Sequence, residues 1–281
     1  MKYLSTQGLK REANKVRQDV IKMITSVGSG HPGGSLGIVD VMVALYFRIM
    51  NHNPDKPNWK DRDRLILSSG HTCPAQYAAL AHAGYFVSTK LSKLRKLGSP
   101  LQGHPEKGKL PGIETTSGPL GCGLAQAVGI ALAARMDDAR FRIFCITSDG
   151  EHDSGNHWEA VMAANKYKLS NLTLFVDRNR IQIDGPTEEV MPLDPLVEKY
   201  KAFGWHVLEI DGHNFEEIIK ASDEARACYQ GPTAIIAKIV PGKGVSFMEG
   251  DFRWHGKAPS PEEAKQALKE LVDEEKSYGR K

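Results

Sequence analysis

The sequence predicts an α/β protein with a doubly wound, mainly parallel sheet and helices on both faces. Two patterns indicate this fold: short apolar runs of strand length alternate with segments of helical periodicity, and turn residues follow the apolar runs. The chain has 281 residues, of which 41% are hydrophobic and 25% charged, so it can bury a large core. We therefore expect one domain over residues 1–281.

The amino-terminal half is predicted to be mainly helical. A helical segment over residues 1–60 opens with an amphipathic helix that ends at Gly28. A glycine-rich loop over 29–35 then leads into a strongly apolar helix, and the first strand is expected at 65–67. The predicted helices of this half are 5–27, 38–50, 75–83, 89–97 and 124–134.

The carboxyl-terminal half alternates between strands and helices, as a doubly wound sheet requires. The predicted strands are 142–147, 172–176, 205–210 and 233–240. The predicted helices are 156–168, 196–203, 215–229 and the charged 261–278, which we interpret as a solvated face. Because crossovers between neighbouring strands are almost always right-handed, consecutive strands should be parallel and end at the same edge of the sheet.

The amino-acid composition argues against several classes of function. The formal charge is +3, from 37 basic and 34 acidic residues, which does not indicate nucleic-acid binding. The four cysteines are far apart without a C-x-x-C pair, which argues against a zinc site or a disulfide framework and is typical of a reducing cytosol. No signal peptide or membrane-spanning run is evident. We expect a cytoplasmic protein that binds no membrane.

Polar residues follow two consecutive predicted strands. Ser148-Asp149-Gly150 comes after the first, and Asp177-Arg178-Asn179 after the second. A helix starting after Gly150 would direct its amino terminus at an anion such as a diphosphate. One carboxylate, one amide oxygen and a loop carbonyl are a sparse oxygen set that suits Mg²⁺ or Ca²⁺ when phosphate oxygens complete the shell. The alternative is that Asp149 only caps a helix and Asn179 lies in an ordinary turn.

These residues resemble the thiamine diphosphate motif. The resemblance is carried by Asp149-Gly150, by Asn179 thirty positions later and by Ile181. Trp158-Glu159-Ala160 and Ile183-Asp184-Gly185 are similar to the transketolase form of the motif. The resemblance implies thiamine diphosphate and Mg²⁺ (or Ca²⁺) as cofactors, with Asp149, Asn179 and the Ile181 carbonyl as metal ligands. It also implies that the Gly150 N–H donates to the diphosphate.

Further motifs resemble transketolases in the same order along the chain. They are Ser29-Gly30-His31-Pro32-Gly33, the Gly70-His71 turn, Gly103-His104-Pro105-Glu106, Gly118-Pro119-Leu120 and His255-Gly256. Gly28, Gly30 and Gly33 also satisfy G-x-G-x-x-G, but a helix precedes them, so we reject a dinucleotide site. Taken singly, the glycine runs could be connectors and the histidines packed or solvent-facing.

The resemblance assigns roles to these motifs. His31, His71, His104 and His255 would bind substrate hydroxyls and assist proton transfer, and His71 would also contact the diphosphate. Gly118, Pro119 and Leu120 would contact the thiamine ring through the backbone. Two positions depart from the family: Ser148 replaces a glycine, and Ser154 stands where a glutamate is usual. In the family that glutamate and the one matched by Glu159 link the two cofactors of a dimer, so this chain has only one of the two glutamates of that link.

Transketolases transfer a two-carbon ketol unit from a ketose phosphate to an aldose phosphate. Their activating glutamate lies on a later, pyrimidine-binding domain that has no counterpart in this sequence. The resemblance therefore implies an amino-terminal subunit that is active only with a carboxyl-terminal partner chain, most simply as an α₂β₂ heterotetramer. The alternatives are a subunit of a related thiamine diphosphate synthase, a transketolase for a different sugar, and a non-catalytic cofactor-binding subunit.

Overall fold

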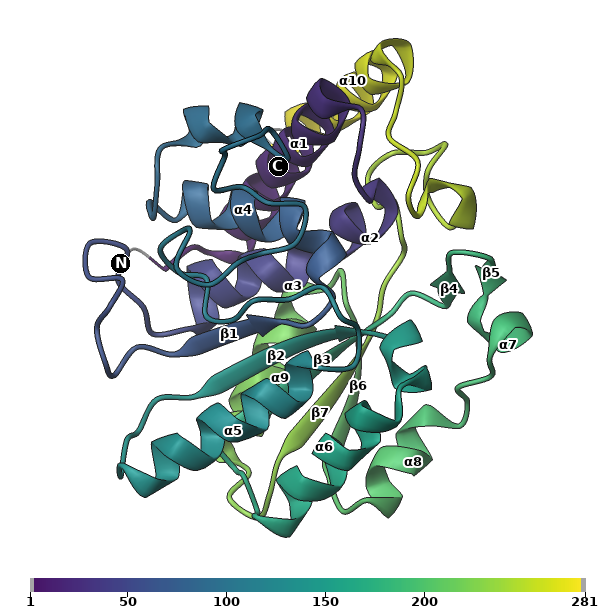
Figure 1. Ribbon diagram of the computed structural model, residues 1–281. Coiled ribbons are helices and arrows are strands. Elements are labelled where there is room, and N and C mark those ends of the chain that lie inside the picture. The colour runs from purple at the N-terminus through teal and green to yellow at the C-terminus, as the bar shows by residue number, and fades with distance from the viewer. Residues whose placement is uncertain (1–2, 279–281) are drawn as a thin grey trace.

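A five-stranded parallel sheet forms the centre of the computed structural model, which describes residues 3–278 (Figure 1). Its strand order is β1-β2-β3-β7-β6, and every neighbouring pair is parallel. The strands are β1 (Arg64–Leu67), β2 (Ile143–Ser148), β3 (Leu172–Arg178), β7 (Thr233–Lys238) and β6 (His206–Asp211). The predicted fold class is confirmed.

Helices cover both faces of this sheet (Figure 1). One face packs against α1 (Thr6–Val27), α2 (Pro32–Gly37), α3 (Val39–Ala44), α4 (Cys73–His82) and α9 (Phe215–Ala227). The other packs against α5 (Gly123–Met136), α6 (Gly155–Lys166) and α8 (Leu196–Ala202). Because side chains alternate along a strand, neighbours such as Phe144 and Cys145 of β2 enter opposite cores. This two-sided burial explains the continuous apolar runs of the strands.

Two predicted elements in the amino-terminal half were wrong, and a third was confirmed in extent but not in its helix type. The expected loop over 29–35 contains α2, which begins at Pro32 because the first helical position needs no backbone N–H. The expected helix over 38–50 is α3 followed by the π-helical turn Leu45–Ile49. The expected basic helix over 89–97 is the 3-10 helix Ser88–Lys93. The opening helix is confirmed, with Ser5 as its N-cap and Gly28 (φ 63°) as its C-cap.

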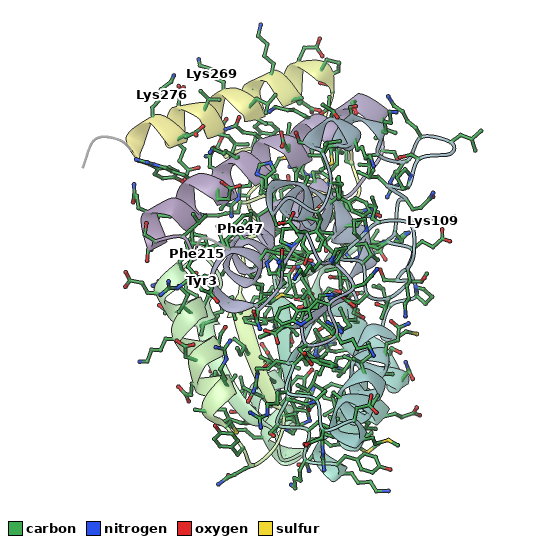
Figure 2. The ribbon with its side chains drawn as sticks, turned by 90° about the vertical axis from the view of Figure 1, so that its left-hand side faces the viewer. Tyr3, Phe47, Lys109, Phe215, Lys269 and Lys276 are labelled. Carbon is green, nitrogen blue, oxygen red and sulfur yellow. The ribbon has the colours of Figure 1, made fainter. Side chains whose placement is uncertain are left out.

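The last helix, α10 (Pro261–Ser277), lies along α1 on the outside of the molecule (Figure 2). Lys269 and Lys276 point away from it into solvent, as the charged sequence predicted. Its inner side is not solvated, because Ala267 and Leu271 are buried in the core next to α1. Within residues 3–278, no helix has the length and apolarity needed to cross a bilayer.

His82, at the end of α4, is held between two carboxylates of α1. Its Nδ1 lies 2.7 Å from a Glu12 oxygen and its Nε2 lies 2.9 Å from an Asp19 oxygen. Burial alone would lower the pKa of His82, but these hydrogen bonds outweigh it and raise the pKa to about 9. His82 therefore has a structural role, because it joins α4 to α1.

We expect the stabilisation by His82 to depend on pH. Because its folded-state pKa lies above the ordinary 6.5, the contribution is fully present below that value and is lost as the pH rises through about 9. His82→Gln should therefore lower the urea midpoint at pH 6 and have a much smaller effect near pH 10. His206→Gln, at the more exposed His206–Glu224 pair, is the control. Equal losses for His82→Gln at both pH values would contradict the assignment.

Candidate functional site

A cavity of about 300 Å³ opens at the carboxyl ends of β1, β2 and β3. It brings together ten of the predicted site residues, namely His31, His71, His104, Gly118, Leu120, Asp149, Gly150, Asn179, Ile181 and His255. Two others do not line it. Pro119 is exposed to solvent, and Glu159 lies on the outer side of α6 because it follows the buried His157 by only two helical positions.

Strand pairing places the predicted metal ligands together. Ser148 of β2 is in register with Asp177 of β3, and the Asp149 N–H donates to the Asp177 carbonyl at 3.2 Å. Asp149 and Asn179, which follow these paired residues, both line the cavity. The expectation that two consecutive parallel strands end at one site is confirmed.

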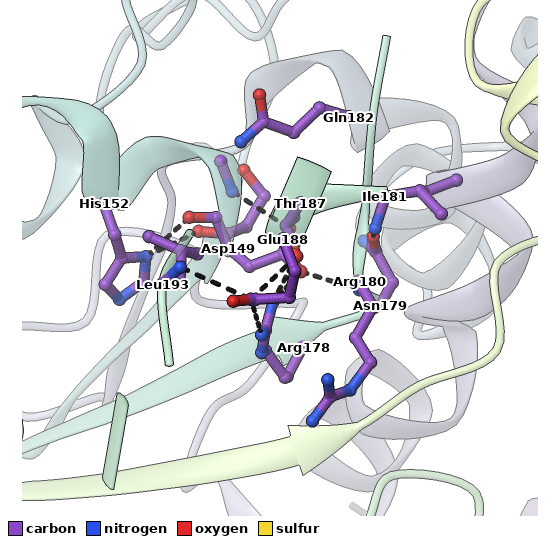
Figure 3. A network of polar contacts seen from close by, with 12 residues as sticks. Asp149, His152, Arg178, Asn179, Arg180, Ile181, Gln182, Thr187, Glu188 and Leu193 are labelled. Atoms are coloured by element: carbon purple, nitrogen blue, oxygen red, sulfur yellow. Dashed lines mark hydrogen bonds and ion pairs between the residues drawn. The ribbon is translucent and has the colours of Figure 1, made fainter. Parts of the chain in front are cut away.

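The Asp149 carboxylate is buried and accepts three hydrogen bonds (Figure 3). Its Oδ2 accepts from the Arg180 N–H at 2.7 Å and from Arg178 Nη1 at 3.1 Å, while Oδ1 accepts from the Gly150 N–H at 2.9 Å. Burial raises the pKa of Asp149 to about 6, although Arg178 and the Arg180 N–H oppose the shift. Because burial penalises its charged form, a divalent cation bound here would relieve that penalty.

Arg178 is a site residue that the sequence did not single out. It is only 3% exposed, and its guanidinium joins Asp149 to Thr187, Glu188 and Asp194 (Figure 3). These partners lie on the segment after the small antiparallel ribbon β4 (Ile181–Gln182) and β5 (Gly185–Pro186), around α7 (Thr187–Val190). The guanidinium thus fixes one oxygen of Asp149 from behind the cavity.

The second predicted ligand, Asn179, is oriented by its own loop. Its Oδ1 accepts from the Ile181 N–H at 3.0 Å, and its Nδ2 donates to Asp177 Oδ1 at 3.1 Å. These two hydrogen bonds turn the amide oxygen of Asn179 toward the Ile181 side of the loop. Burial and the neighbouring Asp149 raise the pKa of Asp177 well above its usual range.

This donor set fits a divalent cation that shares its shell with a phosphate group. No three His, Cys, Asp or Glu side chains within residues 3–278 form a complete metal cage. Asp149, Asn179 and the Ile181 carbonyl offer one carboxylate and two neutral oxygens, which is the sparse set that Mg²⁺ uses together with substrate phosphates. The cavity beside them has room for the phosphate oxygens that would complete the shell.

The predicted helix over 156–168 is confirmed as α6, but the expectation that its amino terminus directly follows Gly150 is wrong. A 3-10 helix (Gly150–Asp153) follows β2, and α6 begins only at Gly155. The reason is that the next two side chains turn inward: Glu151 and His152 are both buried and bind backbone groups of the turn. The Gly150 N–H that was expected to face a diphosphate is bonded to Asp149 Oδ1.

Glu151 ties three loops of the site together and was also missed. Its Oε2 accepts from the Gly121 N–H at 3.0 Å and from the Ser68 hydroxyl after β1, and its Oε1 accepts from the Ser148 N–H at 3.1 Å. The Ser68 oxygen accepts in turn from the Gly123 N–H. Burial raises the pKa of Glu151, but all of its partners are donors. The glycine segment is thereby fixed to the tips of β1 and β2.

The four predicted histidines also line the cavity. The rings of His31, His71 and His255 have centroids 5.1 to 5.6 Å apart. Burial, together with His255, lowers the pKa of His31 to about 4 and that of His71 to about 3. Burial also lowers the pKa values of His104 and His255. The cluster is therefore neutral at pH 7 and can both accept and donate hydrogen bonds.

The cavity is open on one side. Leu120 is 46% exposed and Ile183 is 70% exposed at its rim, although both are apolar. Gly118, with φ 149°, lies beside His104, whose ring would be 3.7 Å from an added Cβ. A flat ligand group could therefore approach the backbone of this segment closely.

The parallel sheet, the oxygen donors at its carboxyl edge and the neighbouring histidine cluster define a diphosphate-binding α/β protein. Residues 9–278 match the family model "Transketolase, thiamine diphosphate binding domain". The chain belongs to this family, whose cofactor is thiamine diphosphate. It is 45% identical to the 6-deoxy-6-sulfo-D-fructose transketolase subunit SqwG of Clostridium sp. (strain MSTE9), over 95% of this chain and 97% of that one.

Two further comparisons show how much of each related protein this chain spans. One of the subunits of the apulose-4-phosphate transketolase of Phocaeicola vulgatus is 40% identical, with 96% of both chains covered. The crystal structure of a transketolase from Campylobacter jejuni superposes with a TM-score of 0.86 at 32% identity, covering 98% of this chain but 48% of that one. The chain thus spans about half of that transketolase and nearly all of the relatives that are named as subunits.

Proposed function

We propose that this chain is the amino-terminal, diphosphate-binding subunit of a transketolase and folds as one domain. The reaction is transfer of a two-carbon ketol unit from a ketose phosphate to an aldose phosphate. The observation that supports it best is the convergence of Asp149, Asn179 and the Ile181 carbonyl with four neutral histidines in one cavity. The location would be the cytoplasm, where the four cysteines, all free in the structure, would remain reduced.

The residues of the cavity divide into two groups. Asp149, Asn179 and the Ile181 carbonyl would hold Mg²⁺ and, through it, the diphosphate. His31, His71, His104 and His255 would bind substrate hydroxyls, and their neutral imidazoles can take up or release a proton there. Bound thiamine diphosphate supplies the group that stabilises the carbanion formed in ketol transfer.

A partner chain would complete the site. The apolar rim residues Leu120 and Ile183 are exposed where the thiamine ring would need a cover. Exposed apolar side chains also occur on two neighbouring helices, with Met136 on α5 and Met162 on α6. Both surfaces suit a heterotetramer of two copies of each chain, in which the partner contributes the activating glutamate and Glu159 approaches the symmetry-related half.

A second candidate function differs in the donor sugar. The relative with 45% identity is named for a sulfonated ketose, 6-deoxy-6-sulfo-D-fructose. A sulfonate and a phosphate are both tetrahedral oxyanions, so the same cavity would accept either donor if the partner supplies the cationic groups. Comparing fructose 6-phosphate with its 6-deoxy-6-sulfo analogue as donor, under identical conditions, separates the two candidates.

The decisive experiment compares the chain alone with the reconstituted complex. The chain is purified with and without the product of the neighbouring reading frame, and ketol transfer is assayed with thiamine diphosphate and Mg²⁺. We expect no transfer by either chain alone and turnover by the pair. Transfer by this chain alone would contradict the proposed division between subunits. A complex that forms and binds cofactor but transfers no ketol unit from either donor would contradict the proposed reaction.

A further inference from the structure

Three buried polar side chains form a chain behind the metal-binding turn. They are His152 after β2, His157 on α6 and Tyr200 on α8, none more than 3% exposed. The Tyr200 hydroxyl lies 2.8 Å from His152 Nε2 and 2.7 Å from His157 Nε2. On its other side, His152 Nδ1 lies 2.9 Å from the Asp149 carbonyl and 3.1 Å from the Ser148 carbonyl. The chain therefore connects α6 and α8 to the backbone of the residue that would bind the metal.

The chemistry of the partners fixes the direction of every hydrogen bond. His152 Nδ1 faces only carbonyl oxygens, so it must carry the proton. His152 is buried, and its ring nitrogens contact carbonyl and hydroxyl oxygens but no carboxylate, so the ring is neutral and its Nε2 must accept from the Tyr200 hydroxyl. The Tyr200 oxygen is then free to accept, and His157 Nε2–H donates to it. His157 Nδ1 is left as a bare acceptor, and it has no hydrogen-bond partner in the part of the chain that the structure describes.

We propose that Tyr200 is a positioning residue for the metal site. Its hydroxyl holds His152 in the Nδ1–H tautomer, and that N–H fixes the carbonyls of Ser148 and Asp149 and so the direction of the Asp149 side chain. This inference rests on the proposed function, because it takes Asp149 to be a metal ligand.

The segment that leads into α8 also contacts the metal site at a second point. The residues before α8 hold Arg178 through Thr187, Glu188 and Asp194, and Arg178 fixes Oδ2 of Asp149 (Figure 3). Tyr200 therefore acts on the backbone of Asp149 while Arg178 acts on its side chain. Outer partners of this kind typically change metal affinity by about 10- to 100-fold.

Tyr200→Phe tests the proposal with little change of volume. The aromatic ring is held by Trp158 and Trp205, with centroids 5.6 Å away in both cases, so phenylalanine should keep its place. The variant leaves His152 Nε2 without its donor, so only the two carbonyls still favour the Nδ1–H tautomer and the ring loses a contact that holds it in place. In the complex with the partner chain, we expect the Mg²⁺ concentration for half-maximal activity to rise about tenfold, with kcat restored at saturating Mg²⁺.

Tyr85→Phe is the matched control. The Tyr85 hydroxyl also bonds to a buried histidine, 2.9 Å from His52 Nδ1, but this pair does not contact the metal-binding turn. We expect Tyr85→Phe to lower the melting temperature and leave the Mg²⁺ requirement unchanged. If Tyr200→Phe also lowers only the melting temperature, its role is merely structural and the proposal is overturned.

The tautomers can be measured without any variant, metal or partner. Nitrogen-15 NMR of the full-length chain should find His152 protonated at Nδ1 and His157 at Nε2. Protonation of His152 at Nε2 would overturn the proposal even if Tyr200→Phe failed to fold. Because this measurement involves no catalysis, failure of the proposed function would leave its result intact. His152→Asn retains an N–H near the Nδ1 position and should rescue the Mg²⁺ requirement relative to His152→Leu.

Discussion

Asp149→Asn is expected to reduce Mg²⁺-dependent binding of thiamine diphosphate by about 100-fold or more, because it removes the only carboxylate among the predicted ligands. Asparagine also places an amide NH₂ where Asp149 Oδ1 accepts from the Gly150 N–H, or where Oδ2 accepts from Arg178 and Arg180. One donor then faces another in either orientation. Titration of cofactor into the reconstituted complex at several Mg²⁺ concentrations, followed by tryptophan fluorescence, measures the loss.

The same substitution should destabilise the ligand-free chain only slightly, because two effects on its stability oppose each other. Burial raises the pKa of Asp149 to about 6, so at pH 7 the folded chain contains a carboxylate whose charged form is penalised. Arg178 keeps Glu188 and Asp194 as partners after the change. The donor that faces another donor lowers the stability, and the loss of the penalised charge offsets part of that cost, so we expect a small fall in melting temperature together with lost cofactor binding. A large fall in melting temperature would indicate misfolding instead, and normal cofactor binding would refute the site. Asp153→Asn, at an exposed carboxylate of the same turn, is the control.

The sequence predicted those parts of the site that depend on local patterns and strand direction. Asp149 and Asn179 follow consecutive apolar runs, and right-handed crossovers bring such strand ends to one edge. The histidine at position 71 follows β1 and reaches the same cavity for the same reason. Each of these expectations needed only the order of the elements and the residue type after each strand.

The residues that the sequence missed are those whose partners are distant along the chain. Glu151 bonds to Ser68, 83 positions away, and His152 bonds to Tyr200, 48 positions away. Helical propensity does not register such acceptors and donors, which is why the amino terminus of the 156–168 helix was expected directly after Gly150. The two side chains turn inward to reach their partners, and the regular helix begins only at Gly155. Arg178 was missed for the same reason, since nothing local distinguishes it from an exposed arginine.

Glu151→Gln is expected to lower the free energy of unfolding by about 3 kcal/mol, because it replaces a buried charged acceptor with a group that is half donor. Glu151 accepts from the N–H groups of Gly121 and Ser148 and from the Ser68 hydroxyl. In glutamine, the NH₂ must face one of these donors in either amide orientation. Urea denaturation of the chain measures the change. Glu198→Gln, at an exposed position on α8, should stay within about 0.5 kcal/mol.

Because of its position, the loss of Glu151 should also lower the affinity for the cofactor. The carboxylate is the contact through which the turn after β2 holds the glycine segment that contains Gly118 and Leu120, and both of these residues line the cavity. Without it, the segment should move relative to the Asp149 turn, so the affinity for thiamine diphosphate should fall at saturating Mg²⁺. Asp149→Asn should show a different combination, in which the stability falls less and Mg²⁺-dependent binding of the cofactor is lost. If Glu151→Gln unfolds at the normal urea concentration, Glu151 does not join these loops in solution.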